Sequence, residues 1–208
     1  MDIKTIDTDY KITTDSGGTP KTVNIPDLQN TVNLRAFAGG VWFDGGDLKT
    51  SKPLNFGTQD FSIFSIVEKS SGEGSQLFRG FVGGNNRIVL YFSATGEPSV
   101  IFIDSGGSVT TYTMSSYTLP DNQVALVGFA LDRDGDASLY VNGQLVDSVD
   151  ISGSSEVDIG RGNVSEHFLF KFRNVKMFRD FTAFSLALTS TQAAEIAAEG
   201  VGPWLARH

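Results

Sequence analysis

Three aspartates within five positions form the most suggestive charged group in the chain. They lie in the segment Asp132-Arg133-Asp134-Gly135-Asp136. A calcium loop of the EF-hand kind needs oxygen ligands at alternate positions and a bidentate glutamate at the twelfth. Counted from Asp132, the twelfth position is Gly143, and strand-like apolar runs flank the segment on both sides. The pattern therefore favours a hairpin turn at Asp134-Gly135, with Asp132 and Asp136 on its solvated rim, over a metal loop.

The sequence lacks the residue patterns of a transition-metal site and of a serine nucleophile, but it contains residues of the kind that bind sugars. The chain has no cysteine, and its two histidines, His167 and His208, are far apart in sequence, so a transition-metal site has little to build on. No Gly-x-Ser-x-Gly nucleophile elbow is present. Sugar sites use aromatic platforms beside hydrogen-bonding groups. The candidates for such a platform are Trp42, Tyr91, Tyr112 and Tyr117, and the alternative for each is core or cross-strand packing.

Length and charge limit the classes of protein to which the chain can belong. Its 208 residues suit one domain, or one domain plus an arm. A formal net charge of −8 argues against nucleic acid as a partner, because phosphate binding needs clustered lysine and arginine. No apolar run is long enough for a membrane span, and residues 1–30 lack the apolar core of a signal peptide. If Met1 is the natural start, we expect no export by the general secretory route.

The elements that must position these residues are short strands separated by turn signals, as in an antiparallel sandwich. The predicted strands are Val41–Phe43, Phe61–Glu68, Gln76–Val82, Arg87–Ser93, Ser99–Asp104, Val109–Met114, Val124–Asp132, Ser138–Val141, Gln144–Val149, Val157–Ile159 and Phe168–Phe178. Asn142-Gly143 favours a tight reversal between two of them. One short helix is predicted after the last strand, with Thr189 and Gln192 forming a capping box and Gly200 ending it.

The core is expected to lie between two sheets. Its predicted members are apolar or aromatic residues at strand positions, several of them spaced by two. They are Phe43, Phe61, Ile63, Leu90, Phe102, Leu126, Leu139, Val141, Ile159, Phe170 and Phe172.

The first 35 residues differ in texture from the rest of the chain. They are polar and rich in threonine and aspartate, with short alternating pieces such as Thr22-Val23-Asn24-Ile25. We interpret residues 1–35 as an N-terminal arm, extended or partly ordered, and residues 36–208 as the domain. The alternative is a first pair of edge strands on the same domain.

Several segments, in order, resemble the laminin-G-like, concanavalin A-like jelly-roll family. The segment VALVGFALDRDGDASLYVNGQLVDS resembles the central hairpins of that family. Val41-Trp42-Phe43-Asp44-Gly45, FSIFSIVEK from Phe61, Ile159-Gly160 and the closing stretch from Phe170 resemble its other strands. The resemblance covers roughly residues 37–200 and implies an all-β, antiparallel jelly-roll β-sandwich with one short C-terminal helix. The helix and the tail Gly200 to Trp204 are also similar to such domains in bacteriophage virion proteins.

The resemblance also raises calcium and catalysis as questions. Some members bind calcium through the aspartate that corresponds to Asp44, but Asn174 stands where another acid is often found. Asp44 is therefore the metal candidate, with a structural role as the alternative, and we expect weak or no calcium dependence. Related glycoside hydrolases carry Glu-x-Asp-x-x-Glu on one strand. Glu156-Val157-Asp158 begins that pattern, but Arg161 stands at its third acidic position, so we assign no catalytic residue.

Together these observations predict a non-catalytic jelly-roll module of a phage particle. It would decorate the capsid, or form part of a head fibre or of the tail, and would be made in the host cytoplasm and displayed on the virion surface. Virion proteins are the expected partners, through the N-terminal arm. A surface glycan and a homo-oligomer are further partners that the interpretation allows. The alternatives are a glycoside hydrolase of the same fold and a structural protein without a ligand.

Overall fold

The structure, a computed structural model, describes most of the chain from residue 56 onward and a few strands before it. The described residues are 11–14, 22–24, 41–42, 47–49, 56–69, 71–72, 74–81, 86–159, 172–173, 175–184 and 186–207. For the strands before residue 56, for residues 172–183, and for residues 80, 81, 201, 202 and 205, the backbone alone is described. Phe43, Asp44, Arg161, His167, Phe170, Asn174 and His208 lie outside the described residues.

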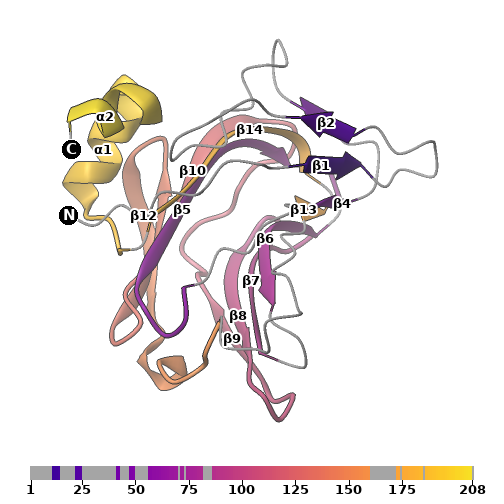
Figure 1. Ribbon diagram of the computed structural model, residues 1–208, viewed down its shortest axis with the longest axis vertical. Coiled ribbons are helices and arrows are strands. Elements are labelled where there is room, and N and C mark those ends of the chain that lie inside the picture. Colours follow the sequence, from indigo (N-terminus) through magenta and orange to yellow (C-terminus); the bar gives the residue numbers. More distant parts are fainter. Residues whose placement is uncertain are drawn as a thin grey trace.

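Two antiparallel sheets form a sandwich, as the sequence predicted (Figure 1). The larger sheet has eight strands in the order β2-β1-β4-β13-β6-β7-β8-β9, and the smaller has six in the order β12-β11-β10-β5-β14-β3. The chain crosses between the sheets several times, for example from β5 to β6, from β9 to β10 and from β12 to β13, whereas β6 to β9 and β10 to β12 each follow one another within one sheet. Two helices at the C-terminus, α1 and α2, lie outside the smaller sheet (Figure 1).

The bounds of the elements agree closely with the predicted strands between residues 61 and 150. They are β1 Lys11–Thr14, β2 Thr22–Asn24, β3 Val41–Trp42, β4 Asp47–Lys49, β5 Phe61–Lys69, β6 Ser75–Phe81, β7 Arg87–Phe92, β8 Pro98–Ile103, β9 Val109–Thr113, β10 Val124–Leu131, β11 Asp136–Val141, β12 Gln144–Asp150, β13 Phe172–Arg173, β14 Val175–Phe184, α1 Ser190–Glu199 and α2 Val201–Arg207. The predicted strand Val157–Ile159 is reduced to a single bridge between Gly57 and Ile159, after a short 3-10 helix at Ser152–Ser154.

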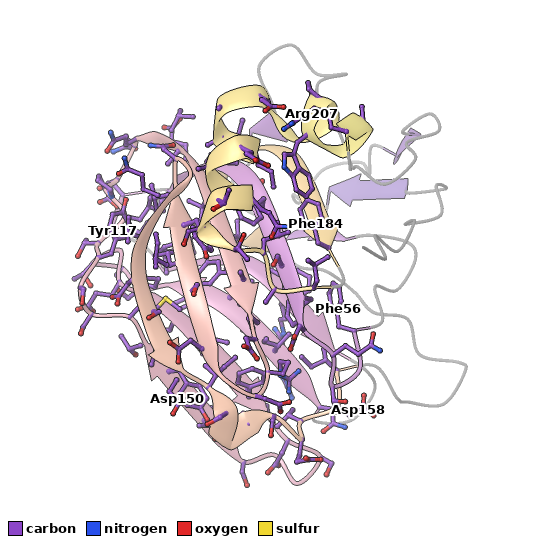
Figure 2. The ribbon with its side chains drawn as sticks, turned by 90° about the vertical axis from the view of Figure 1, so that its left-hand side faces the viewer. Phe56, Tyr117, Asp150, Asp158, Phe184 and Arg207 are labelled. Carbon is purple, nitrogen blue, oxygen red and sulfur yellow. The ribbon has the colours of Figure 1, made fainter. Side chains whose placement is uncertain are left out.

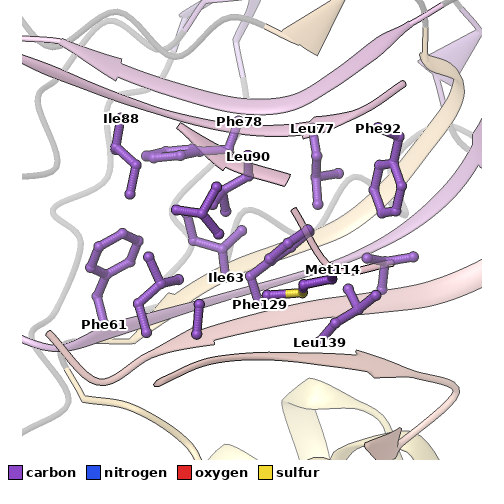
Figure 3. Packing of buried hydrophobic residues seen from close by; sticks show 14 of the residues in the cluster. Phe61, Ile63, Leu77, Phe78, Ile88, Leu90, Phe92, Met114, Phe129 and Leu139 are labelled. Carbon is purple, nitrogen blue, oxygen red and sulfur yellow. The ribbon is translucent and has the colours of Figure 1, made fainter. Parts of the chain in front are cut away.

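The main core lies between the two sheets and combines phenylalanine rings with leucine, isoleucine and valine side chains (Figure 3). Phe56 stacks on Phe61 with ring centroids 4.2 Å apart, and Phe92 meets Phe129 edge to face at 5.8 Å. The predicted core residues Phe61, Ile63, Leu90, Phe102, Leu139, Val141 and Ile159 are all buried in this cluster, which confirms their assignment. The core is thus filled by rigid side chains that fix the spacing of the sheets.

The prediction that Leu126 lies between the two sheets is wrong, because its side chain is on the outer face of the smaller sheet. In β10, Val127, Phe129 and Leu131 point into the main core. Side chains alternate along a strand, so Leu126 and Ala130 point outward. There they pack against a second apolar cluster rather than the first.

The C-terminal helices bury that second cluster against the outer face of the smaller sheet. Trp204 of α2 is fully buried and meets Phe184, which is labelled in Figure 2, edge to face at 5.7 Å. Its Nε1 donates to Glu195 at 2.8 Å. Thr189 caps α1 in a capping box with Gln192, and Gly200, with φ of 84°, ends it as predicted. A second helix, α2, then begins directly after Gly200, which the sequence did not predict.

The two turns predicted at Asp134-Gly135 and at Asn142-Gly143 are both present. The Asp132 N–H donates to the Asp136 carbonyl at 3.0 Å and the Gly135 N–H to the Asp132 carbonyl at 3.1 Å, which closes the β10–β11 hairpin. Asn142 and Gly143 adopt φ of 51° and 81°, the left-handed pair that a two-residue hairpin loop requires. The segment is therefore a turn.

Residues 11–14 and 22–24 form a hairpin at one edge of the larger sheet. β1 pairs with β2 and also with β4 of the domain. The division of the chain at residue 36 and the docking role of residues 1–35 stay predictions. Within the described residues, no helix is long and apolar enough to cross a membrane.

Candidate functional site

The outer face of β6 to β9 is the candidate site, because the outer face of the smaller sheet is covered by helices. Leu90 and Val100 of these strands belong to the main core. Direct cross-strand partners share one face of a sheet, and neighbours along a strand point to opposite faces. Residues adjacent to Leu90 and Val100 therefore point away from the sandwich.

One row of such residues crosses all four strands. Gln76 is paired with Tyr91, Tyr91 with Ser99, and Ser99 with Thr113. The hydroxyls of Ser99 and Thr113 are 3.2 Å apart. The row thus combines a tyrosine ring with an amide and two hydroxyls, the groups that saccharide sites use.

The Tyr91 side chain packs against the backbone of Gly74. A Cβ atom built on Gly74 would lie 1.9 Å from the Tyr91 Oη atom, so the tyrosine hydroxyl occupies the space that a side chain at residue 74 would need. Gln76, its cross-strand partner, has a buried Oε1 atom that accepts no hydrogen bond from the described part of the chain. A half-buried ring therefore lies next to a buried amide oxygen.

The charge of this face differs from that of the whole chain. Strands β6 to β9 contain Arg79 and Arg87 but no aspartate or glutamate. Arg79 is paired with Val89, and Arg87 with Ile103, so both arginines share the outer face with Tyr91. In a chain with a net charge of −8, these four strands are locally positive.

The four predicted aromatic residues do not form one platform. Tyr112 is paired with Val100, points to the core side, meets Phe102 edge to face at 6.0 Å and shares a 2.9 Å hydrogen bond with Ser154. Tyr117 packs against the main core, and burial raises the pKa of its hydroxyl. Trp42 is in β3 of the other sheet, paired with Met177, and its side chain is not described. As ligand contacts, all four residues stay predictions.

The carboxylates singled out in the sequence lie at one end of the sandwich. Glu156 is exposed and Asp158 half-buried, in a segment that belongs to neither sheet (Figure 2 labels Asp158). Among the described residues, no group of three or more His, Asp or Glu side chains could hold a metal ion.

Arg133 is the residue that the sequence analysis missed at this end. Its side chain is 1% exposed, lies over the Phe102 ring at 4.8 Å, and donates through Nη2 to the carbonyls of Ser154, Ser155 and Val157 at 2.7, 3.1 and 2.8 Å. Desolvation by burial lowers the pKa of the guanidinium, and the charges of Asp60, Asp134 and Asp158 oppose that shift. No local pattern signals this role, because the carbonyl partners are at least 21 positions away.

Several solved structures share the fold at low sequence identity. The binding domain of botulinum neurotoxin DC in complex with SialylT is 14% identical, with a TM-score of 0.57, over 93% of this chain and 52% of that chain. The ligand-binding domain of botulinum neurotoxin serotype D in complex with N-acetylneuraminic acid is 12% identical, with a TM-score of 0.50, over 92% and 51%. The native heptameric SAP-like pentraxin from Limulus polyphemus is 12% identical, with a TM-score of 0.52, over 78% and 81%. The chain spans about half the length of these neurotoxin chains.

The family assignment comes from the sequence itself. No curated protein sequence matches this chain. Residues 38–191, more than half of the chain, match the laminin G model described as the concanavalin A-like lectin/glucanases superfamily. This protein is therefore a member of the concanavalin A-like lectin/glucanases superfamily.

Proposed function

We propose that this protein is a non-catalytic module that binds a glycan on the outer face of β6 to β9. The observation that carries the proposal is the row Gln76, Tyr91, Ser99 and Thr113 on the outer face of those strands. A pyranose ring would lie on the exposed part of Tyr91, and one of its hydroxyls would bond to the exposed Thr113 side chain.

The electrostatics of the face favour an acidic glycan. Arg79 and Arg87 bring positive charge to it, and β6 to β9 supply no carboxylate that would repel a sugar acid. The same lack of carboxylates argues against glycoside hydrolysis there, since that reaction uses a pair of them. Two structures similar to this chain are described with SialylT and with N-acetylneuraminic acid, which supports a carboxylate-bearing sugar as the first ligand to test.

A glycan array followed by titration calorimetry on the hits tests the proposal. We expect Tyr91→Ala to abolish binding without unfolding the protein. Gly74→Ala should weaken it, because the new methyl group would displace the tyrosine hydroxyl. Val124→Ala, an exposed position on the other sheet, is the matched control and should bind as the wild type does.

Three results would count against the proposal. Binding that survives Tyr91→Ala would move the ligand to another surface. Hydrolysis of the bound glycan that disappears in Glu156→Gln would make the protein an enzyme. Absence of binding to every glycan on the array would favour the alternative that the protein is a structural component without a ligand.

We also propose that the module is a component of a phage particle, displayed on the virion surface and docked to virion proteins by residues 1–35. The similarity of residues 188–204 to the tails of such domains in phage virion proteins supports this assignment. Immunogold labelling of particles should locate the protein on the capsid or the tail. A chain lacking residues 1–35 should fold but no longer join particles, and unfolding of that chain would show that the hairpin β1–β2 belongs to the domain.

A further inference from the structure

The free edge of β9 offers an unprotected strand for pairing. β9 pairs with β8 on one side, and no other described strand pairs with its second side. Exposed strand edges in soluble proteins are usually blunted by charged residues, proline or a bulge. β9 reads Val-Thr-Thr-Tyr-Thr, with none of these, and its register with β8 is unbroken.

The hydrogen-bond pattern shows which backbone groups face outward. The Met114 N–H donates to the Pro98 carbonyl, and the Asp104 N–H to the Ser108 carbonyl. Hydrogen-bonded and non-hydrogen-bonded pairs alternate in an antiparallel ladder, so Thr110 and Tyr112 direct their backbone groups to β8. The N–H and C=O groups of Val109, Thr111 and Thr113 therefore point away from the sheet.

The side chains around this edge are exposed and uncharged. Val109 is 62% exposed, and Thr110, Thr111 and Thr113 are exposed as well. Residues 105 to 120 contain no charged residue, although the chain carries 16 basic and 24 acidic side chains. β-Branched and aromatic residues of this kind favour strand pairing.

These features point to a second copy of this chain as the occupant. Two copies of a protein with a net charge of −8 repel each other, so a contact between them is best made where acids are absent. β12, the edge strand of the smaller sheet, carries Asp147 and Asp150, which would face like charges in a symmetric pair. β9 itself carries no charged side chain, and Asp147, the acid near its end, is held by the Ser116 N–H at 2.7 Å.

We propose that β9 pairs antiparallel with β9 of a second copy about a two-fold axis at Thr111. Val109 of one copy then faces Thr113 of the other, and the three outward N–H groups of each copy match three outward carbonyls. The pairing would cover the exposed Val109 side chain and join the two larger sheets into one. Because a five-residue strand offers a small contact, the dimer should depend on concentration.

Sedimentation velocity over a concentration series tests the proposal with the full chain. The wild type should shift from monomer to dimer as its concentration rises. Thr111→Lys places two positive charges opposite each other at the axis and should stay monomeric with an unchanged melting temperature. Val124→Lys adds the same charge at a 48% exposed position in the other sheet and should dimerise as the wild type does.

Amide exchange and cross-linking then identify the surface and the register. Exchange of the Val109, Thr111 and Thr113 amides should slow with concentration, while the Thr110 and Tyr112 amides, already bonded to β8, should not change. The chain has no cysteine, so Thr111→Cys should form a disulfide-linked dimer on oxidation faster than Thr110→Cys does.

Four results would overturn the proposal. They are a wild type that is monomeric throughout, a Thr111→Lys variant that dimerises normally, faster cross-linking at residue 110, and protection of the β9 edge by a different protein rather than by a second copy. None of these outcomes depends on whether a glycan binds to Tyr91.

Discussion

Replacing Arg133 should destabilise the protein more than any other single change of an arginine among the described residues. The guanidinium connects the β10–β11 turn to the segment 154–157 and covers the Phe102 ring. The Arg133 N–H is in turn held by Asp60 at 2.8 Å. Removal of the side chain leaves this backbone bond in place, but it separates the turn from the segment 154–157 and uncovers the Phe102 ring.

The size of the loss follows from opposing contributions. Removing the guanidinium leaves one buried and two partly buried carbonyls without their donor, which costs about 1–3 kcal/mol for each acceptor that is left unsatisfied. The guanidinium is also desolvated, and its Nε and Nη1 atoms have no hydrogen-bond partner among the residues that the structure describes, so its removal recovers about 1–2 kcal/mol. For Arg133→Ala we expect a net loss of about 2–4 kcal/mol in the free energy of unfolding.

Urea denaturation of a small set of variants separates hydrogen bonding from packing. Arg133→Met keeps much of the contact with Phe102 and loses the bonds to the three carbonyls, so its cost should fall below that of Arg133→Ala. Arg207→Ala is the control, because Arg207 is 50% exposed and its pair with Glu199 is worth about 0–1 kcal/mol. An Arg133→Ala variant as stable as Arg207→Ala, with an unchanged slope against urea, would refute this reasoning.

Four further predictions concern the core, the turns, acid stability and metal. Phe129→Ala should cost about 3–5 kcal/mol in urea denaturation, because the ring is fully buried; Asp134→Ala, on the exposed rim of the hairpin, should cost far less, and equal losses would contradict the turn. Gly143→Ala should lower the melting temperature, since its Cβ would lie 2.5 Å from that of Ala197 in α1 and the residue has φ of 81°; an unchanged value would show that α1 does not rest on this turn. The hydrogen bond from the buried Lys69 lowers the pKa of Asp121, so this pair stabilises the fold above the unfolded pKa of about 3.9, and the contribution is lost as pH falls through the folded pKa. Asp121→Asn should therefore be destabilising at pH 7 and nearly neutral at acid pH. A loss of stability that does not depend on pH would contradict this. Adding a chelator should leave the melting temperature unchanged, and a sharp fall would reveal a calcium site, with Asp44 as the first residue to test.

Local patterns were sufficient to predict the strands of the central region. Alternating apolar residues, the Asn142-Gly143 turn and the capping box at Thr189 each act over a few positions, so sequence order alone indicates the resulting element. The end of the last strand was less predictable. β14 continues to Phe184, six residues past the predicted end at Phe178, with irregular pairing to β5 along its length.

The sequence contains a pattern indicating that the outer face of the smaller sheet is buried, although the strand predictions relied on alternating residues and did not use it. β5 and β10 read as almost continuous apolar runs, FSIFSIV and VALVGFAL, rather than as strict alternation. Such runs are typical of strands that are buried on both faces. That reading would have assigned Leu126 to the outer cluster and required a helix over it.

The candidate site was only partly predictable, because the residue type of an aromatic side chain does not show which face of its sheet it occupies. Tyr91 and Tyr112 are the same residue type, and each lies in a predicted strand, Tyr91 in RIVLYF and Tyr112 in VTTYT. Their faces differ because Tyr91 lies next to the core residue Leu90, whereas Tyr112 is paired with the core residue Val100. The partners of Arg133 are separated from it by long stretches of chain, so no local rule identifies them.

The distribution of burial explains why both proposed interactions fall on the larger sheet. The smaller sheet has its inner face in the main core and its outer face beneath α1 and α2, where Phe64, Tyr140 and Phe184 contact the helices' cluster. Its edge strand β12 carries Asp147 and Asp150, whose charges oppose pairing with a second β12. The strands β6 to β9 lack carboxylates, present Tyr91 on their outer face and leave the β9 edge unpaired among the described residues. A dimer through β9 would place two Tyr91 faces on one continuous sheet, so a multivalent glycan could engage both copies, and the apparent affinity would then exceed that of the Thr111→Lys monomer.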